Sequence, residues 1–251
     1  MNHSVEKVVW VRQWNESLFS FAVTRPASFR FLSGQFVMLG LMVDGKPLLR
    51  DYLMASPYYG EELEFLSIIV QDGPLTSRLQ HIKAGDDILL AAKPVGSLVL
   101  DALLPGKNLH MIGTGTGLAP WLALARDPDV YDRFDQVTVQ HTVRNKNDLA
   151  YFDLLSSKLA DDPLVAEEAA VKFHYDWAAT REPAGPDHDS RRITDRIRDG
   201  SYKLDPETDR VMLCGSMAMI KETASIVEGL SFTEGVRSGP GTFVLERAFV
   251  G

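Results

Sequence analysis

The chain has 251 residues, of which 45% are hydrophobic and 24% are charged, a composition typical of globular proteins with one large domain or two ordinary ones. Its formal net charge of -8 argues against a general nucleic-acid-binding protein, although it does not exclude a local basic patch. The single cysteine, Cys214, excludes an internal disulfide framework and a cysteine-rich zinc or iron–sulfur site.

The N-terminal residues, the apolar runs and the histidines indicate where the protein is located and whether it binds a metal. The first ten residues, MNHSVEKVVW, lack the apolar core of a secretory signal peptide, and no apolar run is long enough to span a bilayer. The six histidines are scattered without metal-ligand spacing. We therefore expect a cytoplasmic protein with no metal site, no membrane partner and no nucleic-acid partner.

Short strands dominate the prediction for the first hundred residues. Residues 18–23 (LFSFAV) alternate with the period of a half-buried strand, and residues 34–43, 63–70 and 87–92 are further apolar or alternating runs. One helical segment, residues 74–82 (PLTSRLQHI), interrupts them. Closely spaced strands of this kind predict a small antiparallel barrel or sandwich. Turn-forming residues separate the strands at Gly34, Asp44–Pro47, Tyr58–Glu62 and Lys83–Asp87.

After residues 103–108 (LLPGKN), predicted strands alternate with predicted helices. Such alternation predicts a parallel sheet with crossover helices. We therefore expect two domains, 1–103 and 104–251, joined at the Pro-Gly segment. The predicted strands are residues 108–112, 136–143, 171–177 and 210–214, and the predicted helices are residues 118–127, 148–159 and 216–230.

A glycine-rich stretch, MIGTGTGLAP at residues 111–120, follows the first predicted strand of the second domain and begins its first predicted helix. Helix N-termini have unpaired N–H groups and a partial positive charge, and glycine lets a phosphate approach the backbone closely. The spacing at Gly113, Gly115 and Gly117 is G-x-G-x-G, with Leu118 where the usual dinucleotide fingerprint has its third glycine. The pattern alone is therefore compatible with a pyrophosphate cradle or with an ordinary structural turn.

Arginines near the ends of the following strands favour the cradle. Dinucleotide enzymes that prefer NAD have an acid after the second strand, whereas an arginine there accommodates a 2′-phosphate. In this chain the second strand, VTVQHTVR, ends in Arg144, and Arg181 and Arg192 lie further on. Arginine binds phosphate bidentately through a fixed fork of donors. Exposed arginines can also be plain solvated surface, and Arg191 could serve in place of Arg192.

Six motifs occur in order along the chain: RDYLMASP, SIIVQDGPLTSRL, GTGTGLAP, TVRNKNDLAY, MLCGS and the C-terminal ERAFVG. Together they resemble the bacterial ferredoxin–NADP reductases, also called flavodoxin reductases, from about Val5 to Gly251. The resemblance implies an N-terminal antiparallel Greek-key barrel that binds FAD and a C-terminal Rossmann-like parallel α/β domain that binds NADP, with a tail that returns to the flavin. It also implies a monomer that transfers a hydride between NADP(H) and FAD and single electrons between FAD and ferredoxin or flavodoxin.

The resemblance assigns FAD contacts mainly to the first domain. Arg50 matches the arginine that pairs with the FAD pyrophosphate, and Tyr52 matches a tyrosine that stacks on the flavin ring, which suits an aromatic face. Tyr52 could instead be an ordinary core residue of the barrel. The other matching positions are Ile68, Ile69 and Val70 along the flavin, Gly73, Leu75 and Thr76 at a pyrophosphate-binding helix start, Thr116 in the glycine stretch, and Phe249 against the adenine.

The resemblance assigns NADP contacts and catalytic positions to the second domain. Cys214 and Gly215 match the strand end beside the nicotinamide, although a lone cysteine is more often a buried structural thiol. Glu246 matches an acid with a proton-handling role, and a surface acid is the alternative. Ala248 matches the residue that covers the flavin face in the subclass with this ending. The NADP set is completed by Gly115, Thr116, Gly117, Arg144, Arg181 and Arg192.

One position departs from the family motif R-x-Y-S, which reads RDYL here, so that Leu53 replaces the serine. In the family that hydroxyl lies near flavin N5, the atom that accepts hydride. Because leucine is bulkier and has no donor, and because misplaced reactants can slow a reaction about a hundredfold, we predict slow hydride transfer. With Tyr52, Leu53 is thus a candidate catalytic residue as well as an FAD contact. Asp51 also falls among the FAD contacts, and we expect it to point away from the pyrophosphate, on the face opposite Arg50.

Three functions remain open from the sequence. The first is an FAD-dependent NADPH reductase of ferredoxin or flavodoxin. The second is a related reductase that supplies electrons to an oxygenase, with NADH as an alternative donor, although the three arginines argue against NADH. The third is a flavin-binding redox sensor with little turnover, which the leucine at position 53 keeps open.

Overall fold

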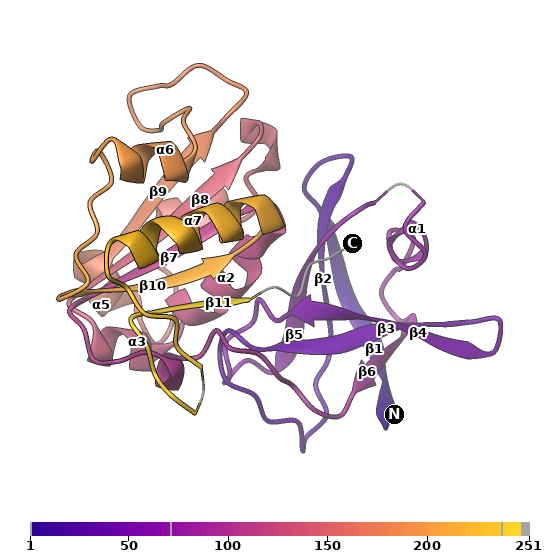
Figure 1. Ribbon diagram of the computed structural model, residues 1–251. Coiled ribbons are helices and arrows are strands. Elements are labelled where there is room, and N and C mark those ends of the chain that lie inside the picture. Colours follow the sequence, from indigo (N-terminus) through magenta and orange to yellow (C-terminus); the bar gives the residue numbers. More distant parts are fainter. Residues whose placement is uncertain (1, 71, 237, 247–251) are drawn as a thin grey trace.

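The computed structural model describes residues 2–70, 72–236 and 238–246. Figure 1 shows two lobes side by side, a barrel of purple strands and a sheet flanked by helices in pink to yellow. None of the described helices is both long and apolar enough to cross a membrane.

The N-terminal lobe is a six-stranded antiparallel sheet in the order β4-β3-β6-β1-β2-β5. The edge strands meet through an isolated bridge between Met54 and Phe65, which closes the sheet into a barrel. After β5 the chain returns to lie between β3 and β1, a Greek-key connection. The strands are β1 (His3–Gln13), β2 (Leu18–Thr24), β3 (Phe36–Val43), β4 (Lys46–Leu53), β5 (Glu62–Ile68) and β6 (Asp87–Ala91).

The barrel agrees with the sequence prediction except at two strands and one helix. β1 and β4 were absent from the predicted strands, because exposed and charged side chains interrupt the apolar alternation in both. The helix expected at residues 74–82 is only one turn long, α1 (Thr76–Leu79). Apolar side chains from β2, β3, β5 and β6 fill the barrel, with Phe21, Leu39 and Phe65 completely buried.

The C-terminal lobe is a five-stranded parallel sheet in the order β11-β10-β7-β8-β9. The chain starts in the middle at β7, winds outward to β9, and then crosses back to β10 and β11. The neighbours β7 and β10 therefore form the switch point of a doubly wound sheet, where such folds bind nucleotides. The strands are β7 (Asn108–Thr114), β8 (Gln136–Val143), β9 (Phe173–Ala179), β10 (Asp209–Cys214) and β11 (Phe243–Glu246).

Helices cover both faces of this sheet (Figure 1). On β10, Met212 belongs to the cluster beneath one face, whereas Val211 and Leu213 belong to the cluster beneath the other, as the two-residue period of a strand requires. The helix predicted at residues 148–159 is shorter, because a left-handed Tyr151 delays its start. The helices are α2 (Ala119–Ala125), α3 (Pro128–Arg133), α4 (Phe152–Ser156), α5 (Ala166–Lys172), α6 (Ile193–Arg198) and α7 (Met217–Gly229).

The two lobes share one hydrophobic cluster, which runs from Leu18 and Leu53 of the barrel to Leu118 and Cys214 of the α/β lobe. A polar network lies across the same interface. The Tyr151 hydroxyl lies 2.6 Å from Oε1 of Glu64 on β5, whose other oxygen lies 3.1 Å from Nη2 of Arg126. The predicted boundary at residues 103/104 lies between β6 and β7 and stays a prediction, while the predicted two-part fold is confirmed.

Candidate functional site

A cavity of about 650 Å³ lies between the lobes, at the carboxyl ends of β7, β8 and β10. It brings together six of the residues predicted from the sequence to bind NADP. The barrel contributes Ser17, Leu18 and Ile68 to its wall. The six predicted residues in its lining are Gly115, Thr116, Arg144, Arg181, Arg192 and Gly215.

The glycine stretch forms a short 3-10 turn, Gly115–Leu118, between β7 and α2. Gly115 has a φ of +55° and open space around it, so it supplies a backbone conformation that other residues rarely adopt. Gly117 instead lets the turn approach the backbone of Cys214 closely, because an added Cβ would lie 2.5 Å from the Cys214 carbonyl oxygen. The turn therefore packs directly on the end of β10.

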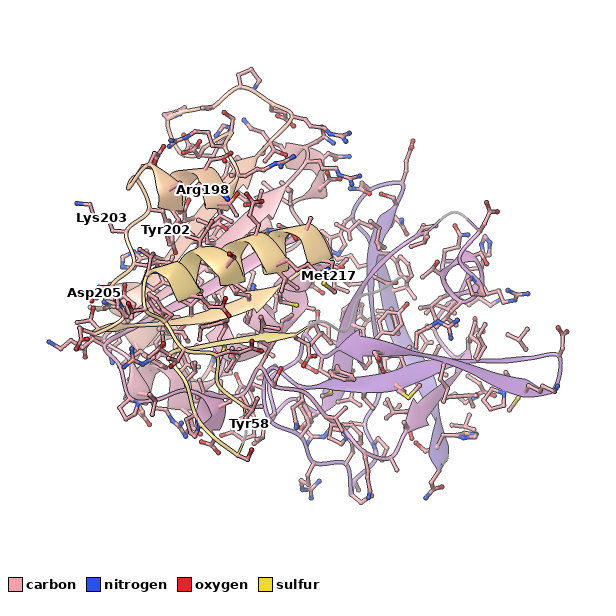
Figure 2. All side chains as sticks on the ribbon, in the orientation of Figure 1. Tyr58, Arg198, Tyr202, Lys203, Asp205 and Met217 are labelled. Carbon is pink, nitrogen blue, oxygen red and sulfur yellow. The ribbon has the colours of Figure 1, made fainter. Side chains whose placement is uncertain are left out.

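The loop after β10 is fixed against the same turn. The Ser216 N–H donates to Oγ1 of Thr114 over 2.8 Å, and Gly215 has a φ of +134°. The Ser216 hydroxyl caps α7 by accepting from the Met219 N–H over 3.3 Å. Figure 2 places Met217, the first residue of α7, at the end of the helix that faces the barrel. The positive end of a thirteen-residue helix thus lies beside the cavity.

Three guanidinium groups at the cavity have no partner among the residues that the structure describes. Within the described part of the chain, the exposed side chains of Arg144, Arg181 and Arg192 donate no hydrogen bond and form no ion pair. The carboxylates nearby are engaged elsewhere, since Glu222 lies 2.6 Å from Arg198 and Asp148 accepts from the Asn145 N–H. We call these three side chains, Arg144, Arg181 and Arg192, the arginine rim. In a chain of net charge -8, the arginine rim is a local positive site suited to a phosphate.

The loops that carry two of these arginines are joined. The Arg181 N–H donates to the Arg144 carbonyl over 2.9 Å, and the Thr180 N–H donates to the Val143 carbonyl over 3.0 Å. The neighbouring Asn145 and Asp148 form a reciprocal capping box. The backbone beneath Arg144 and Arg181 is therefore ordered without help from a ligand.

Ile68 and Val70, two of the residues predicted to contact FAD, form an apolar edge next to the cavity. Ile68 is 47% exposed and Val70 is 46% exposed, whereas Ile69 packs toward the barrel core. Two exposed branched side chains on one face suit a flat apolar ligand. Past them, the Thr76 hydroxyl lies 3.2 Å from the N–H and carbonyl of Val70, forming a compact turn. An added Cβ on Gly73 would lie 2.5 Å from that hydroxyl oxygen, and Leu75 is buried.

The RDYL motif alternates along β4. Arg50 is exposed, and among the described residues its guanidinium donates only to the neighbouring Leu49 carbonyl, over 2.8 Å. Tyr52 is 8% exposed, contacts Phe21 and Phe65 edge-on, and has its hydroxyl 3.2 Å from that of Ser67. Burial raises the pKa of the Tyr52 hydroxyl. Tyr52 thus packs with the barrel core, and its predicted stacking on the flavin ring stays a prediction.

The two remaining residues of the motif lie on the other face of β4. Asp51 is half-buried, and burial raises the pKa of its carboxyl group. As neighbours on β4, Asp51 and Arg50 lie on opposite faces of the strand, and the predicted outward orientation of Asp51 relative to the pyrophosphate stays a prediction. Leu53 is 2% exposed and belongs to the cluster shared by the two lobes. Leu53 therefore holds the lobes together whatever its effect on hydride transfer.

The predicted catalytic residues of the second domain have contrasting surroundings. The Cys214 side chain is fully buried, and burial raises the pKa of its thiol. The neighbouring Gly215, not the thiol, lines the cavity. Glu246 pairs with Cys214 across β10 and β11, and its Oε2 accepts from the N–H and hydroxyl of Ser97 over 2.9 and 3.0 Å. Ala248 and Phe249 lie outside the described residues.

Comparisons with known proteins agree with this geometry. The oxidoreductase FAD-binding domain family matches residues 7–99, and the oxidoreductase NAD-binding domain family matches residues 111–225. A ferredoxin–NADP reductase of Azotobacter vinelandii is 47% identical over 99% of this chain and 98% of its own length. The chain belongs to the bacterial ferredoxin/flavodoxin–NADP reductase family.

Two further members of the reductase family are similar over nearly their whole length. A flavodoxin/ferredoxin–NADP reductase of Rhodobacter capsulatus is 48% identical over 98% of this chain and 93% of its own. A crystal structure of a ferredoxin NADP+ reductase from Neisseria gonorrhoeae with bound FAD and NADP superposes with a TM-score of 0.90 at 29% identity. That match covers 99% of this chain and 100% of the other.

The two adjacent arginines 191 and 192 have different surroundings. Arg191 is held by ion pairs of 2.6 Å to Asp189 and 2.6 Å to Asp199, so its guanidinium is occupied. Arg192 lines the cavity and forms no ion pair within the described part of the chain, so its predicted contact with NADP stays a prediction. Sequence reasoning left this choice open, because it had no view of the two aspartates as partners.

Sequence reasoning also missed a buried histidine beneath the glycine turn. Nε2 of His141 lies 3.1 Å from the Gly115 carbonyl oxygen, and Nδ1 lies 3.2 Å from the Tyr175 hydroxyl. Burial lowers the pKa of His141 to about 4, so the ring is neutral near pH 7. A carbonyl oxygen only accepts, so Nε2 bears the hydrogen and Nδ1 accepts from Tyr175. The available signal was a histidine inside the predicted strand VTVQHTV.

Proposed function

We propose that this chain is an FAD-dependent reductase that transfers a hydride between NADP(H) and FAD and exchanges single electrons with ferredoxin or flavodoxin. The observation that carries the proposal is the group of three unpaired arginines beside the glycine turn, in a cavity that also includes Ile68 of the barrel. Membership of the reductase family supports the same activity. A 2′-phosphate would pair with Arg144, Arg181 and Arg192, which favours NADP(H) over NAD(H).

The residues present fit FAD on the barrel side of the cavity. Exposed Ile68 and Val70 offer an apolar surface, and Arg50 offers a free guanidinium edge for a pyrophosphate. The amides of Leu75 and Thr76 begin α1 and have no acceptor within the helix, so they would donate to the same phosphates. When bound, FAD supplies the conversion between two-electron and one-electron transfer that side chains do not provide.

The chain's own residues then have distinct tasks. The amides of the Gly115–Leu118 turn and the positive end of α7 would bind the NADP pyrophosphate. The end of β10 at Gly215 would support the nicotinamide, and the buried Cys214 thiol would stay protonated beneath it. Leu53 excludes water without offering a hydrogen bond, and Glu246 is held in place by Ser97 for proton exchange.

The electron partner and the assembly state are also part of this proposal. Relatives are named for ferredoxin and for flavodoxin, so we propose these proteins as the electron partners of a monomeric enzyme. Ferredoxins and flavodoxins of this kind are acidic, and this chain carries a net charge of -8. A local cluster of lysines and arginines near the flavin edge is therefore required for docking.

The test is anaerobic stopped-flow on the FAD-loaded protein, following the visible flavin band after mixing with NADPH or with NADH. We expect fast bleaching with NADPH and much slower bleaching with NADH. Slow bleaching with both donors, without turnover of an artificial acceptor, would contradict the reductase function and favour a redox sensor. Fast bleaching without electron transfer to either ferredoxin or flavodoxin would contradict the proposed partners and favour a reductase that serves an oxygenase.

A further inference from the structure

Five side chains of alternating charge form a network behind the arginine rim. Arg196 lies on α6 and binds Asp176 of β9 with both terminal nitrogens, over 3.1 and 2.8 Å. Its Nε lies 3.4 Å from Asp189, which in turn lies 2.6 Å from Arg191. Arg191 also binds Asp199 at the end of α6, over 2.6 Å. The network thus joins β9, the segment after it, and α6.

Asp189 is the residue that connects these elements. Its carboxylate accepts from the backbone N–H groups of Ser190 and Arg191 over 2.8 and 2.9 Å, in addition to its two arginine partners. Its backbone extends the edge of β9, because its carbonyl accepts from the Ala179 N–H over 3.0 Å and its N–H donates to the Trp177 carbonyl. Its side chain and its backbone therefore fix the same point of the chain.

The backbone of Arg192 is restrained on both sides. The preceding residue, Arg191, is held by the network. On the other side, the Arg192 carbonyl accepts from the Arg196 N–H over 3.2 Å at the first turn of α6. Arg192 is itself the N-cap residue of α6, in an extended conformation. Both flanking positions are restrained, while the Arg192 side chain stays unpaired at the cavity. The segment that starts with Arg181 at the end of β9 thus returns to the cavity at a fixed place.

We propose that Asp189 is a positioning residue that sets the preference of the site for a 2′-phosphate, by anchoring the segment that presents Arg192. The proposal rests on the proposed function, since it assumes that the arginine rim binds the 2′-phosphate of NADP(H). Asp189 does not touch the nucleotide in this role. It acts through Arg191, through Arg196 and through the edge of β9.

The direction of the effect separates positioning from simple electrostatics. A carboxylate near a phosphate site repels the phosphate, so removing its charge alone would tighten binding of the 2′-phosphate. If Asp189 instead holds the segment, its removal frees Arg191 and Arg192 and weakens binding. The two explanations therefore predict opposite signs for the same substitution.

The experiment compares Asp189→Asn with Asp195→Asn in the FAD-loaded protein. Asp195 is a matched control, because its carboxylate is exposed on α6, lies outside the network and, among the described residues, forms its one ion pair with Arg198, at 3.8 Å. Its backbone N–H donates to the Arg192 carbonyl over 3.1 Å, and the substitution by asparagine keeps that bond. Calorimetry would measure binding of 2′,5′-ADP and of 5′-ADP, which differ by the 2′-phosphate. We expect Asp189→Asn to weaken 2′,5′-ADP about tenfold, the scale of one charge-assisted contact, with 5′-ADP unchanged. Asp195→Asn leaves both affinities at the wild-type value.

Steady-state kinetics give a second readout that general loss of structure would not reproduce. In Asp189→Asn we expect KM for NADPH to rise about tenfold while kcat and the KM for NADH stay unchanged. Asp199→Asn removes only the outer partner of Arg191 and is expected to give a smaller shift in the same direction. If Asp189→Asn does not fold, the shift in KM for NADPH in Asp199→Asn tests the positioning role instead.

Two results would overturn the positioning role. In the first, the wild-type protein prefers 2′,5′-ADP, and Asp189→Asn binds 2′,5′-ADP as tightly as the wild type or more tightly. This result contradicts the positioning role of Asp189 and leaves the proposed function intact. A wild-type protein that binds 2′,5′-ADP no better than 5′-ADP contradicts the NADP preference itself, and the positioning role with it.

Discussion

The two predicted cofactor regions are built differently. Around the NADP cavity, predicted residues from five separate segments come together at one place, at positions 115–116, 144, 181, 192 and 215. The backbone that carries them is tied by hydrogen bonds and by glycine-to-backbone contacts. On the barrel side, the predicted FAD residues divide between the exposed edge at Ile68 and Val70, the barrel core at Tyr52, and the shared cluster at Leu53. The first region is therefore preformed, while the second combines binding surface with structural packing.

This difference determines how a substitution acts in each region. A change in the NADP region alters ligand binding through geometry, because the supporting loops pack backbone against backbone. A change on the barrel side alters stability and activity together, because the same side chains fill the core or the interface. Substitutions in the two regions are therefore expected to differ in whether binding or stability changes first.

Gly117→Ala tests whether the NADP region depends on close backbone contact. The new Cβ would lie 2.5 Å from the Cys214 carbonyl oxygen and 2.7 Å from Cα of Gly215, so the two loops must separate. We expect a loss of about 1–3 kcal/mol in unfolding free energy. We also expect flavin reduction at low NADPH to fall about a hundredfold, as for a displacement of about 1 Å.

Gly115→Ala is the control for that substitution. Gly115 needs its positive φ but has nothing within 4 Å of an added Cβ. Its replacement costs about 1 kcal/mol of backbone strain and leaves the contact with β10 in place. Equal effects of the two alanines on NADPH would contradict the close-contact explanation. The measurements are chemical unfolding and stopped-flow with varied NADPH.

The pH dependence of stability tests the support beneath the glycine turn. Burial lowers the pKa of His141 from 6.5 to about 4, so the unfolded chain takes up a proton at this position before the folded chain does. The contribution of the neutral His141 to the free energy of unfolding is therefore fully present above pH 6.5 and is lost as the pH falls toward 4. The total contribution of this group is on the order of 3 kcal/mol. Urea unfolding between pH 7 and 4 measures it.

His141→Gln provides the comparison, since glutamine does not titrate. The acid-dependent loss of stability should shrink in this variant, while Tyr175→Phe keeps the histidine and should retain the loss. An unchanged pH profile in His141→Gln would assign the acid sensitivity to other groups.

Arg192→Ala tests the free member of the adjacent arginine pair. We expect KM for NADPH to rise about tenfold to a hundredfold with kcat unchanged, the cost of one charge-assisted contact to phosphate. KM for NADH should stay as in the wild type. Lys203→Ala removes the same charge from an exposed position that Figure 2 shows on the α/β lobe, away from the barrel. If both variants raise KM equally, overall charge and not the arginine rim governs NADPH binding.

The sequence predicted most of this architecture from local patterns. Alternating strands and helices were enough to predict four of the five strands of the second sheet, all except β11. The glycine stretch was predicted between the first strand and the first helix, where the structure has it. β1 and β4 were missed, because their pairing partners and not their own apolar alternation make them strands. The confirmed fold therefore came from segments whose side chains repeat with the period of their element.

The site was predictable in its residue types but not in its pairings. Arg144, Arg181 and Arg192 were predicted by position, whereas the engagement of Arg191 by Asp189 and Asp199 depends on how α6 packs. His141 was missed because a strand histidine has no spacing signal, and its partner Tyr175 is 34 residues away. Contacts between distant segments carry this information, and local patterns do not contain it.

Leu53→Ser is the substitution that most sharply tests the barrel side, because stability and rate are expected to move in opposite directions. Leu53 is 2% exposed in the cluster shared by the two lobes, so its loss should cost about 2–5 kcal/mol of unfolding free energy. If a hydroxyl here orients the nicotinamide, flavin reduction by NADPH should become about tenfold faster, a barrier change of about 1.4 kcal/mol. Leu53→Ala creates nearly the same space without the hydroxyl. A serine variant no faster than the alanine variant would show that leucine limits the rate by bulk alone, and a serine variant no faster than wild type would remove any role for this position in hydride transfer.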